Sequence, residues 1–275
     1  MENQKIAVIT GAGGVLCSCF ARFLASQGYS VMLLDLNENA AAAAAKQITD
    51  AGLSAYAYAA NVLDRAMLTK VKNRINSQHG SVSLLINGAG GNSPKCTTDK
   101  EKYFEGDIDS ADVKSFFDLD AAGFEFVFNL NCLGTVIPTQ VFAQDMLCDG
   151  GCIINISSMN AYRPLTKIPA YSAAKSAVSN LTQWLAVHFA PVNIRVNAIA
   201  PGFFVTAQNK SLLFDNNGNP TERTKKILAA TPMARFGRPE ELLGTLGWLC
   251  DGESSGFVTG ITVPVDGGFS AYSGV

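Results

Sequence analysis

Short runs of apolar residues alternate along the chain with longer stretches in which apolar positions follow the helical repeat. The apolar runs predict strands at about residues 5–10, 30–35, 54–60, 83–87, 152–157, 193–199 and 260–265. The stretches between them predict helices that include residues 15–27, 38–51, 64–77, 121–148, 169–190 and 239–250. Strands alternating with helices predict an α/β fold: a single Rossmann-type doubly wound parallel sheet of about seven strands, with helices on both faces.

Two polar segments interrupt this alternation. Residues 91–120 are polar and acidic, and residues 203–222 are rich in turn-forming residues before a further helix. Both follow predicted strand ends, where open α/β sheets bind ligands, so we interpret residues 91–120 as a substrate-loop insertion rather than a disordered loop. Neither a linker nor a repeat divides the chain, which predicts one dinucleotide-binding and catalytic domain over residues 1–275.

Composition narrows the class of protein. Hydrophobic residues make up 48% of the chain and charged residues 16%, and the net charge of −2 gives no case for binding nucleic acid or an anionic membrane. We find neither an apolar run of bilayer-spanning length nor a signal-peptide pattern. The seven cysteines are odd in number and lack paired metal-ligand spacing. These features predict a cytoplasmic, reduced and metal-free protein.

The first candidate site lies at the amino end of the chain. The apolar run at residues 5–10 leads into Gly11-Ala-Gly-Gly14 and then into a predicted helix. In that order, backbone amides and a helix N-terminus can hold a pyrophosphate. Asp35 ends the second strand, where a carboxylate accepts hydrogen bonds from a ribose 2′-hydroxyl and repels a 2′-phosphate. The pattern predicts NAD (NADH) as the cofactor, in preference to NADP.

The second candidate site joins Ser158 to Tyr171 and Lys175. Tyrosine and lysine four residues apart share a helix face, and a nearby cation stabilises a phenolate whose ordinary pKa is about 10. Ser158 closes a strand end and can donate a hydrogen bond to the same reacting oxygen. The three can bind a carbonyl or alcohol and move its proton. A solvated helix face is the alternative for the tyrosine–lysine pair alone, and the dinucleotide pattern upstream argues against it.

Together these motifs resemble the short-chain dehydrogenase/reductase family over essentially the whole chain. Thr10-Gly11, Asn87-Gly-Ala-Gly90, Pro201-Gly202 and Val265-Asp-Gly-Gly268 match its motifs in order. The resemblance implies catalytic roles for Asn131, Ser158, Tyr171 and Lys175, with Asn131 anchoring a water that relays protons. It implies a cofactor site made of Gly11, Gly13, Gly14, Val15, Leu16, Asp35, Leu36, Asn61, Val62, Asn87, Gly88, Ala89, Tyr171, Lys175, Pro201, Gly202, Phe204 and Thr206.

One departure from the family pattern concerns the glycine loop. The usual loop reads Thr-Gly-x-x-x-Gly-x-Gly, whereas Val15 and Cys17 stand at the two later glycine positions here. We expect Gly13 and Gly14 to compensate through a shifted turn. The residues that contact the phosphates are therefore open at this point.

A narrower resemblance points to the substrate. Residues 91–131, Arg163-Pro-Leu-Thr-Lys167 and the ending Asp266–Val275 are similar to the short-chain type of D-mannonate oxidoreductase, also called fructuronate reductase. That implies interconversion of D-mannonate and D-fructuronate, with Asn160, Arg163 and Lys167 as substrate contacts. A gluconate 5-dehydrogenase or another polyol or keto-acid reductase is the alternative enzyme, and a catalytically silent nucleotide sensor or scaffold is the alternative class. The family resemblance also implies a homo-oligomer, typically a homotetramer.

Overall fold

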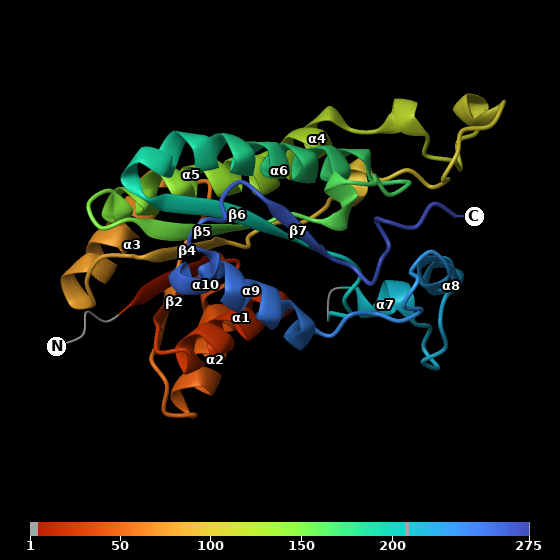
Figure 1. Cartoon of the computed structure of the whole chain (residues 1–275). Helices are drawn as coiled ribbons and strands as arrows, with labels where there is room; N and C mark the ends of the chain where they lie inside the picture. Colours follow the sequence, from red (N-terminus) through yellow and green to blue (C-terminus); the bar gives the residue numbers. More distant parts are fainter. Residues whose placement is uncertain (1–4, 207–208, 275) are drawn as a thin grey trace.

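A parallel sheet of seven strands forms the centre of the structure, a computed structural model that describes residues 5–206 and 209–274 (Figure 1). The strand order is β3-β2-β1-β4-β5-β6-β7, and every neighbouring pair runs parallel. The strands are β1 (Ile6–Thr10), β2 (Ser30–Asp35), β3 (Ala55–Ala59), β4 (Leu84–Asn87), β5 (Gly151–Ile156), β6 (Ile194–Pro201) and β7 (Thr262–Val265). This confirms the predicted fold class, with each strand end within two residues of its expected place.

Helices cover both faces of the sheet (Figure 1). One layer holds α1 (Val15–Ser26), α2 (Glu38–Thr49), α9 (Leu243–Cys250) and α10 (Gly252–Ser255). The other layer holds α3 (Arg65–Gln78), α4 (Ala121–Phe128), α5 (Gly134–Phe142) and α6 (Pro169–Phe189). Because the central strands are covered on both sides, they read as continuous apolar runs rather than alternating ones, and this made them recognisable in the sequence.

Two hydrophobic cores lie on the two sides of the sheet. Phe20 and Leu24 of α1 pack with one face of the central strands and with Leu246 of α9. Phe142 and Leu185 pack with the opposite face. Full burial of one such side chain contributes about 1.5–3 kcal/mol. The carboxyl ends of the strands are therefore held between two packed layers, which gives the site a rigid base.

The long helix before β5 differs from its expected form. A π-helical turn, η4 (Asn129–Leu133), joins α4 to α5 where the sequence pattern predicted one regular helix. By length and composition alone, the joined stretch from Ala121 to Met146 is long and apolar enough to cross a membrane. This corrects our expectation that the chain holds no apolar run of that length. Half of its most apolar window is buried inside the domain, and it packs on α6 and α3, so its apolar character is explained by the core.

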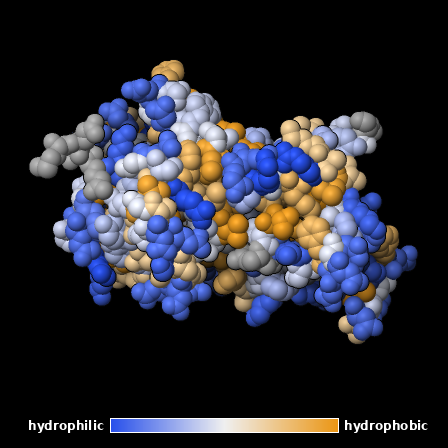
Figure 2. Space-filling view, turned by 90° about the horizontal axis from the view of Figure 1, so that it is seen from below, coloured by the Kyte–Doolittle hydropathy of each residue, from blue (hydrophilic) through white to orange (hydrophobic). Residues whose placement is uncertain are grey.

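The two polar segments lie beyond the carboxyl ends of the strands, as expected (Figure 1). The insertion 91–120 is an extended arm with three short 3-10 turns, at Pro94–Cys96, Asp107–Asp109 and Phe116–Asp118. The second segment forms α7 (Lys210–Leu213) and α8 (Glu222–Ala229). In the view from below, apolar side chains gather in the hollow between the sheet layers and this second segment (Figure 2).

Candidate active site

Ser158, Tyr171 and Lys175 meet at the carboxyl edge of the sheet. Ser158 follows β5 by two residues, and Tyr171 and Lys175 occupy the first two turns of α6. Pro169 is the first residue of α6, where its missing N–H costs nothing and its restricted φ suits a helix. The resulting register turns tyrosine and lysine to the same side, with the lysine Nζ 5.7 Å from the centroid of the tyrosine ring.

Burial raises the pKa of the Tyr171 phenol above its ordinary value, and the nearby Ser158 side chain opposes this only in part. This differs from our expectation that Lys175 lowers the pKa of the phenol. The physical reason is that the Lys175 ammonium donates its hydrogen bond to the backbone carbonyl of Ile156, at 2.8 Å, rather than to the phenol.

Lys175 is itself buried, with almost no exposed surface. Burial lowers the pKa of its ammonium to about 8, against a smaller opposing effect of Cys17. The group is still mostly protonated at neutral pH, but it loses its proton more readily than an exposed lysine. Lys175 can therefore supply a positive charge near the phenol and can also exchange a proton near neutral pH.

Asn131 lies fully buried in the π-helical turn between α4 and α5. Its side-chain amide donates to the carbonyls of Gly91 (2.7 Å) and Val127 (2.8 Å) and accepts from the N–H of Gly91 (3.2 Å). A Cβ atom at Gly90 would stand 2.6 Å from its Oδ1 and 3.1 Å from Nζ of Lys175. Asn131 is thus beside the predicted catalytic group, and its side chain holds the start of the insertion.

The glycine turn after β1 crosses the loop after β4, and the backbones of the two loops lie in direct contact. Gly11 has φ of 66°, and a Cβ there would approach Cα of Ala89 to 2.8 Å. Oγ1 of Thr10 accepts hydrogen bonds from the N–H groups of Gly88 (3.1 Å) and Ala89 (3.3 Å). This crossing brings the predicted cofactor residues of the two loops together at the point where the strand order reverses.

The structure explains how the loop accommodates Val15 and Cys17. Val15 is the first residue of α1 and is exposed, so it requires no glycine. Cys17 is buried at 5% exposure, and its Sγ would lie 2.2 Å from a Cβ atom placed on Gly88. The space for the Cys17 side chain therefore exists because residue 88 is glycine.

The expected compensation by Gly13 and Gly14 takes a different form. The Gly13 N–H donates to the Asp35 carboxylate at 2.9 Å, and the Gly14 N–H donates to the Gly11 carbonyl at 3.1 Å. These two amides are engaged inside the loop. Val15 and Leu16 are the first two residues of α1. Among the described residues, their N–H groups have no such bond within the loop and so remain available at the helix N-terminus.

Asp35 is held at the end of β2 by two backbone N–H groups, those of Gly13 (2.9 Å) and Asn37 (2.8 Å). Leu36 beside it is 77% exposed and offers an apolar surface. Asn61 and Val62 follow β3, where the Asn61 side-chain oxygen accepts from the Leu63 N–H at 3.0 Å. These residues lie along one region of the carboxyl edge of the sheet.

Asn87, a predicted cofactor residue, lies at the end of β4 with its side chain in a buried hydrogen-bond network. Its side-chain nitrogen donates to Thr139 (2.9 Å) and to Asn155 (2.8 Å), and Asn155 donates in turn to Thr182 (2.9 Å). These buried amides and hydroxyls join β4 and β5 to the helices above them. The side chain of Asn87 is therefore turned into the protein interior, where it stabilises the strand end.

The predicted cofactor residues Pro201, Gly202, Phe204 and Thr206 lie at and just beyond the end of β6. A Cβ atom on Gly202 would lie 2.5 Å from Cα of Asp266, so glycine permits the close approach of the two strand ends. Phe204 is buried, and Thr206 is held by Asn209 through a 2.8 Å bond to its N–H. Gln208, which we expected to contribute to the substrate loop, lies outside the described residues.

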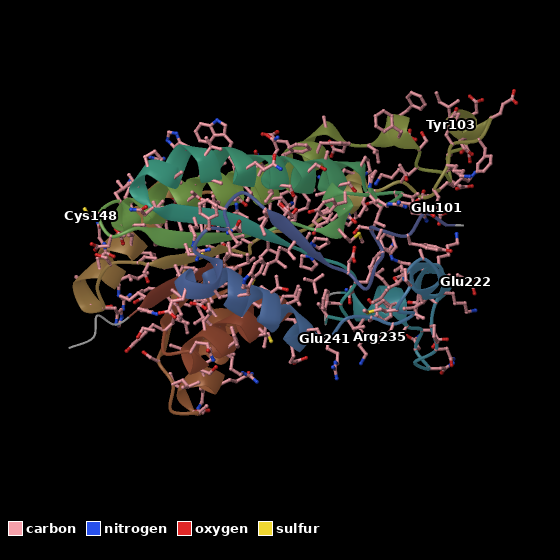
Figure 3. The ribbon with its side chains drawn as sticks, viewed as in Figure 1. Glu101, Tyr103, Cys148, Glu222, Arg235 and Glu241 are labelled. Carbon is pink, nitrogen blue, oxygen red and sulfur yellow. The ribbon has the colours of Figure 1, made fainter. Side chains whose placement is uncertain are left out.

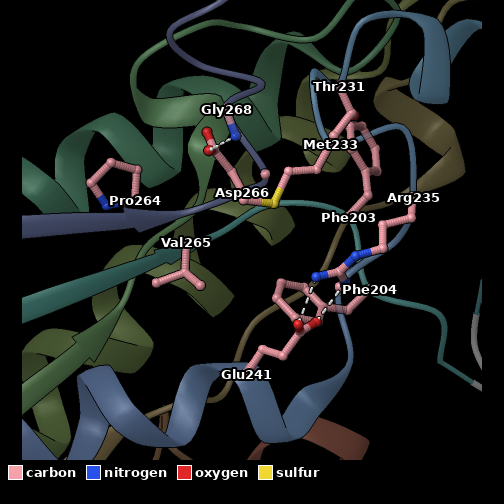
Figure 4. Close-up of a pocket in the computed structure, with 12 residues that line it drawn as sticks. Phe203, Phe204, Thr231, Met233, Arg235, Glu241, Pro264, Val265, Asp266 and Gly268 are labelled. Atoms are coloured by element: carbon pink, nitrogen blue, oxygen red, sulfur yellow. Dashed lines mark hydrogen bonds and ion pairs between the residues drawn. The ribbon is translucent and has the colours of Figure 1, made fainter.

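A cavity of about 340 Å³ lies beneath this segment, between Phe204, Met233 and the end of β7 (Figure 4). The guanidinium of Arg235 makes two hydrogen bonds of 2.7 Å to the carboxylate of Glu241 at its edge. That pairing lowers the pKa of Glu241 to about 2. Arg235 and Glu241 therefore compensate each other, and Asp266 adds a further negative charge to the lining of the cavity.

A larger cavity, of about 610 Å³, lies between residues 163–167, α8, the insertion and the carboxyl-terminal residues. The predicted substrate residues Arg163 and Lys167 line it. Asn160 is buried in the short turn Met159–Ala161, and its side-chain oxygen has no hydrogen-bond partner among the described residues. Sequence reasoning did not single out three further lining residues, Glu101, Arg223 and Lys226. Glu101 lies in the first polar segment, but Arg223 and Lys226 lie on α8, just beyond the second one, where they resemble ordinary surface residues of a helix.

A parallel sheet with an acid at the end of β2 and a serine–tyrosine–lysine group beyond β5 defines a dinucleotide-dependent oxidoreductase that acts on a CH–OH group. The chain matches the model of the short chain dehydrogenase family over residues 5–217, and it belongs to that family. The predicted family is thereby confirmed.

Relatives match the chain over its whole length. An uncharacterized oxidoreductase of Haemophilus influenzae is 58% identical over 276 residues, which cover 100% of this chain and 96% of the relative. The uncharacterized oxidoreductase UxuB of Bacillus subtilis is 56% identical, covering 98% and 96%. A solved Haemophilus structure with bound NAD, provisionally named a D-mannonate oxidoreductase, is 57% identical with a TM-score of 0.95, covering 100% of this chain and 98% of that one.

Proposed function

We propose that this enzyme uses NAD(H) to interconvert D-mannonate and D-fructuronate. The observation that carries the chemistry is the grouping of Ser158, Tyr171 and the buried Lys175, whose Nζ lies 5.7 Å from the centroid of the Tyr171 ring. The choice of substrate is supported by the whole-length similarity to the Haemophilus protein that is provisionally named a D-mannonate oxidoreductase and was solved with NAD.

The edge of the sheet fits NAD. The N-terminus of α1, with the N–H groups of Val15 and Leu16, would hold the pyrophosphate. The Asp35 carboxylate, oriented by the Gly13 and Asn37 amides, would accept hydrogen bonds from the adenosine ribose. The exposed Leu36 side chain would pack against the adenine ring. When bound, NAD supplies the acceptor for the hydride that leaves the substrate carbon.

The side chains of this chain move the proton. In the reductive direction, Tyr171 donates its proton to the substrate oxygen, and its raised pKa keeps it protonated at neutral pH. Ser158 holds the same oxygen by a hydrogen bond. In the oxidative direction, the phenol must first lose its proton, which requires positive charge nearby, and the Lys175 ammonium supplies part of it. Asn131 would anchor a water that connects Lys175 to solvent.

The substrate class follows from the polar surroundings. A hexonic keto acid presents several hydroxyls and one carboxylate. The polar side chains of Asn160, Arg163 and Lys167 suit such a substrate better than they would suit a steroid or an acyl thioester. The Phe203–Phe269 ring pair and Ile227 supply an apolar part of the same cavity wall. A sugar acid can meet both kinds of surface, because its C–H groups can pack on rings while its hydroxyls face polar groups.

The proposal extends to assembly and compartment. Trp184 and Val187 on α6 are 59% and 78% exposed, which is unusual for large apolar side chains and supports a homo-oligomer, with a tetramer as the family-based expectation. The seven unpaired cysteines are compatible with a reducing cytoplasm. Light scattering of the purified protein measures the subunit count directly.

The test is NADH oxidation by the purified enzyme with a panel of keto acids. D-fructuronate should give the highest kcat/KM, and 5-keto-D-gluconate, which differs only in stereochemistry, is the matched competitor. A preference for 5-keto-D-gluconate would favour the gluconate 5-dehydrogenase-like alternative. Binding of NADH without turnover of any hydroxy or keto acid would instead favour the nucleotide sensor.

A further inference from the structure

The cavity of about 610 Å³ brings together charged side chains from three separate segments. The wall 163–167 contributes Arg163 and Lys167, α8 contributes Glu222, Arg223 and Lys226, and the insertion contributes Glu101. Figure 3 shows Glu101 on the insertion and Glu222 on α8 at the same end of the molecule. The cavity therefore holds four cations and two anions, an excess of positive charge in a protein whose net charge is −2.

Most of these charges already have partners. Lys226 makes a 2.8 Å ion pair with Glu101, which joins α8 to the insertion across the cavity. Glu222 pairs with Lys225 on its own helix at 2.6 Å. Arg163 donates to the backbone carbonyl of Tyr272, so its guanidinium holds the carboxyl-terminal segment against the wall. Both anions and two of the cations are thus engaged within the protein.

Two cations remain. Among residues 5–206 and 209–274, neither the Lys167 ammonium nor the Arg223 guanidinium has a hydrogen-bond or ion-pair partner. Lys167 is only partly exposed, so its ammonium is held at the cavity wall rather than extended freely into solvent. Its φ is 72°, a conformation that side chains other than glycine and asparagine rarely adopt. The insertion holds this backbone, since the Thr98 N–H donates to the Lys167 carbonyl at 2.9 Å.

Strained backbone persists where the surroundings hold it in place, and it is concentrated at ligand-binding positions. We propose that Lys167 and Arg223 form the subsite for the substrate carboxylate, and that Arg163 is a positioning residue for the carboxyl-terminal segment. This rests on the proposed function and narrows it. The subsite joins the wall between Ser158 and Tyr171 to α8, so the carboxylate is bound on the insertion side of the reacting carbon.

The subsite assigns different roles to residues that look equivalent in the sequence. Arg223 offers a planar pair of N–H groups to a carboxylate, and Lys167 adds a point charge. Removing one charge-assisted contact costs about tenfold or more in KM, because a hydrogen bond to a charged group is worth about 1.5–3 kcal/mol. The KM for an uncharged ester of the substrate should not change, because the ester has no carboxylate to bind.

The experiment compares Arg223→Gln, Lys167→Gln and the double variant with wild type, on D-fructuronate and on its methyl ester. Each single variant should raise KM for the acid about tenfold and the double variant more, with kcat and the ester kinetics within twofold. Lys70→Gln is the matched control, because this exposed lysine lies on α3 and does not line the cavity. Arg163→Gln should affect acid and ester equally.

Two results would overturn the assignment: an unchanged KM for the acid in both single variants, or equal losses on acid and ester. Thermal melting of each variant separates a folding defect from either result. If wild type prefers another keto acid, the proposed function is wrong, and the same comparison is made with that acid and its ester. The subsite is then supported or overturned on its own evidence.

Discussion

The contact between Cys17 and Gly88 gives a sharp prediction for Gly88→Ala. The new Cβ would stand 2.2 Å from Sγ of Cys17 and 2.8 Å from the carbonyl oxygen of Thr10. Packed non-bonded atoms lie about 3.5–4.0 Å apart, so one of the two loops must move by more than ~1 Å. Both are anchored, since the Gly88 N–H is bonded to Thr10 and Cys17 is buried in α1. We expect a loss of about 1–3 kcal/mol in unfolding free energy, and weaker NAD binding.

Removing the sulfur should restore part of this loss. Cβ of Cys17 would be 3.7 Å from the new methyl group, an ordinary contact, so Cys17→Ala relieves the closer of the two clashes. The clash with Thr10 remains, and the double variant should recover only in part. A coupling energy of about 1–2 kcal/mol between the two substitutions is expected for residues in direct contact.

The assay is urea unfolding of wild type, both single variants and the double variant, together with NADH titration followed by fluorescence. Gly244→Ala is the matched control, because no atom lies within 4 Å of a Cβ at that exposed helical position. It should be neutral or stabilising by up to about 1 kcal/mol. Costs for Gly88→Ala and Cys17→Ala that add to within about 0.5 kcal/mol would refute the role of the sulfur.

Three further outcomes are expected. Tyr171→Phe should abolish turnover and leave NADH binding nearly intact, because only the phenol oxygen exchanges the proton; more than a few per cent of residual rate would remove it from that role. Asp35→Ser should lessen the preference for NAD over NADP by about tenfold or more, as measured by kcat/KM, and equal use of both cofactors by wild type would contradict the assignment. Lys175→Met should abolish activity yet stabilise the apoprotein by up to about 3 kcal/mol at pH 7, since the lysine pKa falls from about 10.4 unfolded to about 8 folded. The buried charge costs most below pH 8, so this gain in melting experiments should shrink as the pH rises to 10, and a gain independent of pH would contradict it.

The local sequence pattern was sufficient to predict the strands and the relative position of Tyr171 and Lys175. A strand covered on both faces, such as β1, is apolar at every position, and it can be recognised without knowledge of its neighbours. The spacing between Tyr171 and Lys175 sets their relative position once they share a helix, so the sequence predicts this part of the site well.

Contacts between distant segments could not be predicted in the same way. The fit of Cys17 against Gly88 joins positions that are 71 residues apart, and no local pattern reports it. The inward turn of the Asn87 side chain depends on partners at Thr139 and Asn155. In the sequence, Arg223 looks like any solvated helix residue. Only the fold shows that it lines the same cavity as residues 163–167.

The hydrogen bonds of Asn131 also bear on how such a protein can diversify. They reach only main-chain atoms, those of Gly91, the first residue of the insertion, and of Val127 in α4. No side chain of the insertion is needed to keep the asparagine in position. Beyond Cys96, which is buried against Ala170 and Ala174 of α6, and Thr98, which holds the Lys167 backbone, the exposed part of the insertion can therefore vary while this junction is kept. In evolution, and in engineering, the exposed part of the insertion can be exchanged without rebuilding the group formed by Ser158, Tyr171 and Lys175.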